Sequence, residues 1–272
     1  MFDTNYYCLV AGLREYSLDG GAKGFDPHAI LDEILRELTP RDLRAVRLLY
    51  GYYDCKNLIA LRAGSPAHDP LGNFARERLK EETEHPRLLP HAIGLVLAAY
   101  ARPDGEEAEE VDTSRPFEQA LFEAYYGLCA ASPSRFLREW SDFDRTLRNV
   151  AAAAGRPVDG HVVGNDDVAE QLRRSSASDF GLRGELPYID AVIAAVNDES
   201  NLLEKEHKID RIRWQQAVDL AAEDYFNVNA VLSYLVRINL VARWTQLDEA
   251  RGRAMLGRLL RELDGKELIN NK

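Results

Sequence analysis

Hydrophobic residues along this chain recur at the three- and four-residue spacing of amphipathic helices. Two helix starts are clear, because Asp26-Pro27 and Thr39-Pro40 each place a capping side chain before a proline at the first helical position. The first start predicts a helix through Leu38, and the second predicts a helix through Leu61 to Gly64. Almost no segment alternates with period two over the length of a strand, so the sequence predicts an all-α fold.

The rest of the chain follows the same pattern, with one exception at the N-terminus. Tyr6–Ala11 is aromatic and β-prone, which predicts a short extended strand or tail. Further helices are predicted over a charged, solvated stretch at 72–85, an apolar, buried stretch at 88–100, after Ser114-Arg115-Pro116, from Ser132-Pro133 to Gly155, at 168–174, from Pro187, and from Leu202 nearly to the end with breaks around Phe226-Asn227 and at Asp248. The pattern therefore predicts several helices packed as bundle lobes.

Acidic residues crowd the middle of the first half of the chain. Between Asp104 and Asp112 the sequence has no large aliphatic residue before Val111, which is typical of an exposed linker. We therefore predict an N-terminal helical lobe at 1–103, an acidic linker at 104–113 and one or more C-terminal helical lobes at 114–272.

The charge and the cysteines limit the possible partners and the location. A net charge of −11 over 272 residues disfavours a nucleic-acid surface, because phosphate binding depends on clustered Lys and Arg. The longest apolar run, Leu88–Ala101, is too short to cross a bilayer of about 30 Å. Cys8, Cys55 and Cys129 lie among apolar or aromatic neighbours, which favours buried reduced thiols. We expect a cytoplasmic protein with no nucleic-acid partner and no membrane span.

Catalytic signatures are weak. The Gly20–Gly24 run does not have the spacing of a phosphate loop, and it leads to a helix capped by the acidic Asp26. The chain contains no Gly-x-Ser-x-Gly elbow, and neither Cys55 nor Cys129 has a histidine nearby in the sequence. We therefore expect no cofactor and no nucleophilic site.

One pattern keeps a metal enzyme open as an alternative. Glu82 with His85 and Glu204 with His207 form two Glu-x-x-His units, the spacing that carboxylate-bridged di-iron bundles use on facing helices. Pro86 places His85 at a helix end, and both units lie among Lys and Glu residues. Solvated charged helix faces are the favoured interpretation, and we expect no bound metal.

A polar stripe on the second predicted helix suggests a structural role. Asp54, Asn57 and Arg62 lie on a helix that also carries Leu58 and Leu61, at spacings that mix polar and apolar groups on one face. Such groups can tie one helix to the next through hydrogen bonds. A catalytic role for Asp54 is the weaker hypothesis, since no base or metal site accompanies it.

Several segments resemble a known family. Asn5–Leu13, Tyr52–Leu58, Tyr234–Arg237 and Arg243–Asp248 resemble a bacterial family of unknown function that is encoded beside V-type ATPase genes, and this match spans most of the chain. A more distant resemblance is to the C-type stalk subunit of archaeal and bacterial V-type ATPases, which in eukaryotes is the d-type subunit, an all-helical protein of stacked lobes.

The second resemblance is carried by three elements. Arg115–Tyr126 is similar to a Pro-Leu-Glu-x-Ala-Leu-Asp-x-x-Tyr-Tyr helix of the C-type stalk proteins, Asp54–Leu58 with Arg62 and Gly64 to their Asp-x-x-Asn-Leu helix, and Val231–Leu235 to the start of a third helix. Arg237–Leu240 departs from that family, which has acidic residues there. The resemblances single out these structural or interface candidates: Asp54, Asn57, Arg62, Glu118, Tyr125, Tyr234, Arg243 and Trp244.

The resemblance implies a coupling piece between the membrane rotor ring and the central stalk of a proton- or sodium-translocating ATPase, without chemistry of its own. Its partners would be V-type ATPase subunits, and it would lie peripherally on the cytoplasmic side of the membrane. Two alternatives stay open: a di-iron helical-bundle oxidase built on the Glu-x-x-His units, and a stand-alone helical adaptor whose acidic linker recruits a basic protein.

Overall fold

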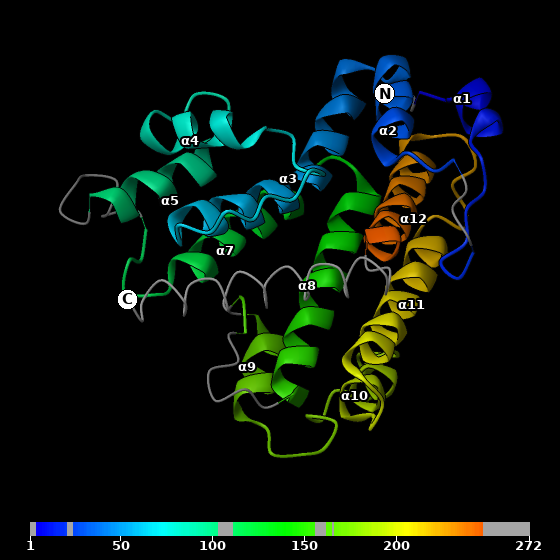
Figure 1. Cartoon of the computed structure of the whole chain (residues 1–272). Coiled ribbons are helices and arrows are strands. Elements are labelled where there is room, and N and C mark those ends of the chain that lie inside the picture. The colour runs from blue at the N-terminus through cyan, green and yellow to red at the C-terminus, as the bar shows by residue number, and fades with distance from the viewer. Residues whose placement is uncertain (1–3, 21–23, 103–110, 156–161, 165, 247–272) are drawn as a thin grey trace, which may run out of the picture.

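The computed structural model describes residues 4–20, 24–102, 111–155, 162–164 and 166–246. Every regular element in these ranges is a helix, which confirms the predicted all-α class. The helices, labelled in Figure 1, are α1 (Tyr7–Gly12), α2 (Pro27–Glu37), α3 (Pro40–Arg62), α4 (Arg76–Glu84), α5 (His91–Ala101), α7 (Phe117–Ala130), α8 (Arg135–Gly155), α9 (Asp167–Arg174), α10 (Ile189–Asn197), α11 (Leu202–Leu220) and α12 (Val228–Gln246). None of the described helices combines the length and apolar composition that crossing a membrane requires.

The predicted caps of α2 and α3 are confirmed. The Asp26 carboxylate accepts hydrogen bonds from the backbone N–H groups of His28 and Ala29, and the Thr39 hydroxyl accepts one from the N–H of Asp42. A side chain from outside the helix completes the second cap, because the Tyr6 hydroxyl accepts from the Thr39 N–H at 3.2 Å and donates to Asp42 at 2.5 Å. The start of α3 is therefore fixed by the N-terminal segment.

The predicted N-terminal strand is wrong. Tyr7–Gly12 forms the short helix α1, even though the segment is aromatic and β-prone. A strand needs a neighbouring strand to satisfy its backbone, and the described residues contain none. Tyr6 instead fixes the segment, because its backbone N–H donates to the Phe226 carbonyl at 2.5 Å while its hydroxyl binds at the start of α3.

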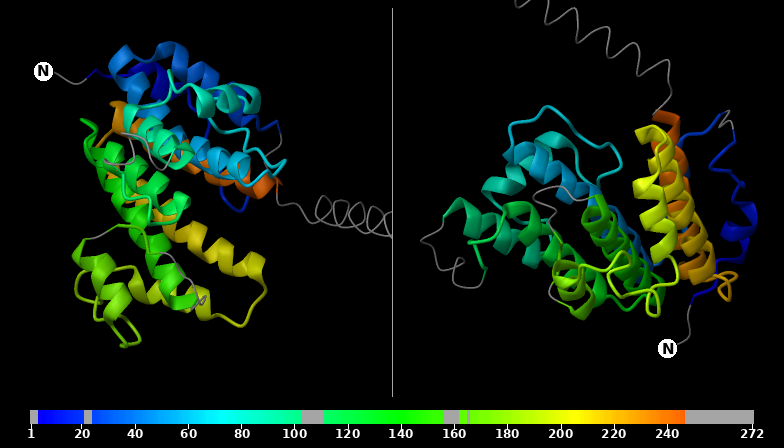
Figure 2. Two further views of the ribbon diagram at one scale, coloured as in Figure 1. Left: turned by 90° about the vertical axis from the view of Figure 1, so that its left-hand side faces the viewer. Right: turned by 90° about the horizontal axis from the view of Figure 1, so that it is seen from below.

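Helix α8 runs through the middle of the molecule and packs against helices on both sides (Figures 1 and 2). Its neighbours are α7 on one side and α10, α11 and α12 on the other. Helix α7 packs in turn on α3 and α5, and α12 packs on α2 and α3. Buried side chains from all these helices form one continuous hydrophobic core. Force applied to one side of α8 can therefore reach the other through packed side chains.

The two predicted lobes share this core. Helices α3 and α5 come before the predicted acidic linker and α7 comes after it, yet they pack together. Most of the linker lies outside the described residues, and its last part is attached to the body: the Arg115 guanidinium pairs with Asp112 at 2.9 Å and with Glu123 at 2.8 Å. The division into lobes, and their arrangement as in the C-type stalk proteins, stay predictions.

The cysteines correct one expectation. Cys55 and Cys129 are buried, as predicted, and burial raises the pKa of the Cys129 thiol to about 12. Cys8 is exposed instead, because Tyr6 is the residue of this segment that faces the core. Its apolar sequence neighbours indicated burial, but a helix of six residues turns only part of its surface inward.

Candidate interaction surface

Asp54 and Asn57 hold the connection between α3 and α4. Both side chains are buried. Asn57 accepts a hydrogen bond from the backbone N–H of Asp69 at 2.6 Å and donates to the Asp69 carbonyl at 3.0 Å. Asp54 accepts from the Asn73 amide at 2.6 Å and from the Phe74 N–H at 3.3 Å. The two residues thus supply a loop with the backbone partners that a helix or sheet would otherwise give.

The environment of Asp54 raises its pKa. Burial is the main cause, and the hydrogen bonds from Asn73 and Phe74 only partly offset it, so the pKa of Asp54 is about 6. These donors are neutral. The raised pKa therefore needs no catalytic role to explain it.

Arg62, Tyr125 and Glu118 lie at the contacts of α7. The Arg62 guanidinium lies over the Phe117 ring, 4.7 Å from its centroid, and also faces the ring of Tyr100. Tyr125 is buried, with its hydroxyl 3.4 Å from the Leu49 carbonyl. Glu118 is exposed. Of the α7 candidates, therefore, only Glu118 is available to a partner.

Arg243 and Trp244 take part in a buried ion network that joins α8, α11 and α12. Asp210 is fully buried and accepts from Arg213 at 2.9 Å, from Arg243 at 2.8 Å and from the Trp244 indole at 2.9 Å. Arg213 also donates to Asp144 at 2.8 Å. Because a buried carboxylate is costly unless paired, this network fixes the three helices in one arrangement.

Tyr234 ties α12 to the chain that follows α1. Its hydroxyl donates to the Arg14 carbonyl at 2.9 Å. The structure therefore brings Arg243 and Trp244 together on α12, and Asp54 and Asn57 together on α3. Arg62 and Tyr125 lie at separate helix contacts, Tyr234 anchors the N-terminal segment, and Glu118 stands alone among the candidates.

The two Glu-x-x-His units lie apart, on α4 and α11 at opposite sides of the molecule (Figure 1). The buried Glu82 carboxylate accepts backbone hydrogen bonds from Arg87, Leu88 and Leu89, so it closes the turn after α4. His207 pairs with Asp19 at 2.9 Å. Within the described part of the chain, no three His, Cys, Asp or Glu side chains gather as a metal site would require.

An exposed aromatic cluster is the feature that sequence reasoning missed. Tyr7 on α1 and Tyr225 and Phe226 in the α11–α12 connection form what we call the aromatic corner. The Tyr7 and Phe226 ring centroids are 4.6 Å apart, and those of Tyr225 and Phe226 are 6.5 Å apart. Tyr225 is 72% exposed and Tyr7 is 57% exposed. The sequence showed Phe226 only as a break between helices, since the approach of Tyr7 depends on tertiary contacts.

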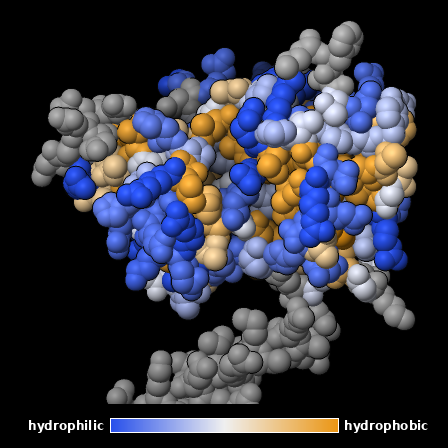
Figure 3. Space-filling model, turned by 90° about the horizontal axis from the view of Figure 1, so that it is seen from above, coloured by the Kyte–Doolittle hydropathy of each residue, from blue (hydrophilic) through white to orange (hydrophobic). Residues whose placement is uncertain are grey.

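The aromatic corner belongs to the upper side of the molecule in Figure 1, where α1 and the α11–α12 connection meet. Seen from above, that side carries hydrophobic patches separated by hydrophilic side chains (Figure 3). Contiguous exposed apolar groups are typical of protein–protein contact sites. The corner is therefore the best candidate for an interaction surface among the described residues.

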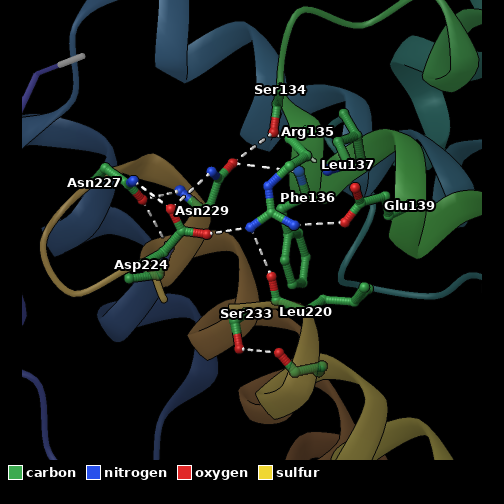
Figure 4. A network of polar contacts seen from close by, with 12 residues as sticks. Ser134, Arg135, Phe136, Leu137, Glu139, Leu220, Asp224, Asn227, Asn229 and Ser233 are labelled. Carbon is green, nitrogen blue, oxygen red and sulfur yellow. Dashed lines mark hydrogen bonds and ion pairs between the residues drawn. The ribbon is translucent and has the colours of Figure 1, made fainter. Parts of the chain in front are cut away.

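A polar network holds the aromatic corner in place (Figure 4). Arg135 at the start of α8 donates to the Asp224 carboxylate at 2.6 Å and to the Leu220 carbonyl at 2.9 Å. Asp224 also accepts from Asn227 at 2.5 Å and from Asn229 at 3.2 Å. Burial alone would raise the pKa of Asp224, but these donors outweigh it and lower the pKa. The connection carrying Tyr225 and Phe226 is thus pinned to α8.

The comparison with known families covers nearly the whole chain. A family model described as "Protein of unknown function (DUF2764)" matches residues 3–266. No curated protein and no solved structure matches the chain. The resemblance to the C-type stalk proteins of V-type ATPases therefore stays a prediction. The chain belongs to the DUF2764 family, a family of unknown function.

Proposed function

We propose that this protein is a non-catalytic V-type ATPase-associated protein, either a connector of the C or d type between rotor ring and central stalk or an assembly accessory. The sequence resemblance motivates the particular partner. The motif residues that carry it lie on α3, α7 and α12, where most of them bind the protein's own backbone and side chains. That use of polar groups is compatible with a connector, which needs a stiff body more than a reactive site.

The aromatic corner is the observation that carries the proposal. Tyr and Phe are enriched at the buried centres of protein interfaces, because a rigid ring covers much area at a low cost in side-chain entropy. Tyr7, Tyr225 and Phe226 present such rings to solvent, and the Arg135–Asp224 network presets the position of two of them. A surface that is already ordered loses little entropy when a partner binds.

The fold would pass force from the corner to the rest of the protein. The network around Asp224 links the corner to the start of α8, and the network around Asp210 links the same helix to α11 and α12 further along. In this proposal the protein lies on the cytoplasmic side of the membrane, with stalk or ring subunits as partners.

Affinity purification from the native host tests the proposal. The tagged protein should recover stalk or ring subunits in near-equal amounts. The double variant Tyr225→Ser, Phe226→Ser should lower that recovery by about tenfold or more, the effect of losing one interface hot spot. Leu88→Ser is the matched control, because Leu88 is also exposed, at 55%, but lies in the α4–α5 connection away from the corner. Recovery of no stalk or ring subunit under conditions that keep the ATPase intact would refute the proposal.

A further inference from the structure

A groove of about 970 Å³ opens between the two sides of the molecule. Residues of α3, α7, α8, α11 and α12 line it. Its apolar surface comes from Phe122, Val196, Leu202, Ile209 and Leu240, and its charged surface includes Glu118, Arg145, Arg148, Lys205 and Glu206. This mixture of an apolar lining and charged groups suits an amphipathic helix.

The cations of the groove are already engaged, which argues against a small anion as the ligand. Arg145 pairs with Asp142 and with Asp166, each at 2.7 Å. Arg148 pairs with Asp144 at 2.7 Å, and the Lys205 ammonium donates to the Val196 carbonyl at 2.9 Å. A phosphate or carboxylate would have to break these contacts to bind.

Two groups in the groove have no cover among the described residues. Leu202 lines the groove and is 74% exposed, more than any other large hydrophobic side chain of the described part. Tyr126 also lines it, and its buried hydroxyl has no hydrogen-bond partner within the described ranges. An exposed leucine next to a buried, unpaired hydroxyl indicates an occupant that offers both apolar and polar groups.

The chain itself leads to the groove. Asn239, Leu240 and Arg243 of α12 line it, so residue 247 follows within about one helical turn of its edge. The 26 residues 247–272 come next in the sequence. As a helix they would span about 39 Å, longer than the about 31 Å of α8, which forms one side of the groove. Their length and starting point therefore fit it.

The sequence of this segment has the pattern that such an occupant needs. Met255, Leu256, Leu259, Leu260 and Leu263 share one face at helical spacing, and Arg251, Arg258 and Arg261 fall on the other. A single amphipathic helix has nothing within itself to cover five large apolar side chains, so this face requires a partner surface.

We propose that residues 247–272 dock in the groove of their own chain, with the face that contains Leu256, Leu259 and Leu263 against Leu202 and its apolar neighbours. This inference concerns an intramolecular contact and does not depend on the proposed function. The acidic residues of the segment, such as Glu262 and Asp264, would then lie at the rim of the groove or in solvent.

Hydrogen exchange of the full-length protein tests the docking from the side of the segment. Amides of residues 255–263 should exchange about tenfold or more slowly than in a synthetic peptide of residues 247–272. Leu259→Gln should remove that protection. Arg258→Gln is the matched control, because it introduces the same side chain one position earlier on the opposite face and should leave the protection unchanged.

The same measurement tests the groove side with two neighbouring leucines. Leu202→Gln should remove the protection of residues 255–263, whereas Leu203→Gln should not, because Leu203 is exposed but does not line the groove. Both positions are exposed, so neither change removes a core side chain. Equal effects of the two substitutions would overturn the proposal.

Concentration dependence separates docking within one chain from the alternatives. Protection that stays constant over a hundredfold dilution supports the proposal. Protection that falls on dilution would mean that the segment binds a second copy, and exchange at the rate of the free peptide at every concentration would leave the groove to a different partner. Either of these two results would refute docking in the same chain.

Discussion

Asp54 and Asp144 are both buried carboxylates at helix contacts, but their partners differ. Asp54 accepts hydrogen bonds from the neutral Asn73 and Phe74, and burial raises its pKa to about 6. Burial acts in the same direction at Asp144, but Arg148 and Arg213 outweigh it, so the pKa of Asp144 is lowered. The same residue type is thus a loop clamp sensitive to pH in one region and a permanent ion in the other.

Removing Asp144 should break the buried network with the largest effect. Asp144→Ala leaves Arg213 buried with one carboxylate partner fewer, and loss of one member of a buried ion pair costs about 3–5 kcal/mol. Urea unfolding measures the change. Asp142→Ala is the control two positions earlier, where an exposed carboxylate pairs with Arg145, and it should cost less than about 1 kcal/mol. Similar losses for both variants would contradict the structural role of the network.

The pH dependence of stability should sharpen the contrast from the side of Asp54. Because its pKa is raised in the folded state, the folded protein holds the proton more tightly than the unfolded chain. The stabilisation is fully present below about pH 4 and is lost as the pH rises through about 6. The stability of the wild type relative to Asp54→Asn should therefore fall by up to about 3 kcal/mol between pH 4 and pH 7. Urea unfolding across this range measures the difference, and a constant value would show that the carboxylate of Asp54 is solvated.

The helices and their caps could be predicted from the sequence because their determinants are local. Asp26 and Thr39 act on backbone groups two or three residues away, and apolar spacing marks the buried face without knowledge of its partner. Segment Tyr7–Gly12 was predicted wrongly, since its conformation depends on the contacts of Tyr6 with α3 and with Phe226. Six residues hold too little periodicity to overrule a β-prone composition.

The candidate surface could not be predicted in the same way. Asp144 and Arg213 lie 69 positions apart, and Tyr7 and Phe226 lie near opposite ends of the described chain. One local signal was available for the network: Asp210 and Arg213, three apart, stand near Ile209 and Ile212, and a charged pair in an apolar setting indicates burial. No local signal distinguishes the exposed Tyr225 from a core aromatic residue.

A backbone position next to Asp54 gives the smallest expected effect and the closest test of its geometry. A Cβ atom at Gly72 would lie 2.8 Å from both the Asn57 amide nitrogen and an Asp54 carboxylate oxygen. Gly72→Ala should therefore displace the loop from its two buried partners and cost about 1–3 kcal/mol in thermal or urea unfolding. The Asp144 network should be untouched, so the cost should add to that of Asp144→Ala in the double variant.

Gly127 provides the control with the opposite sign. It lies inside α7, and a Cβ atom there would meet nothing within 4 Å. Gly127→Ala should stabilise the protein by about 1 kcal/mol, because alanine loses less backbone entropy than glycine in a helix. If Gly72→Ala stabilised the protein as well, the loop would not be held against Asp54 and Asn57 as closely as the structure has it. Opposite signs for the same substitution would show instead that these two side chains, and not the helix propensity of α3, fix the connection to α4.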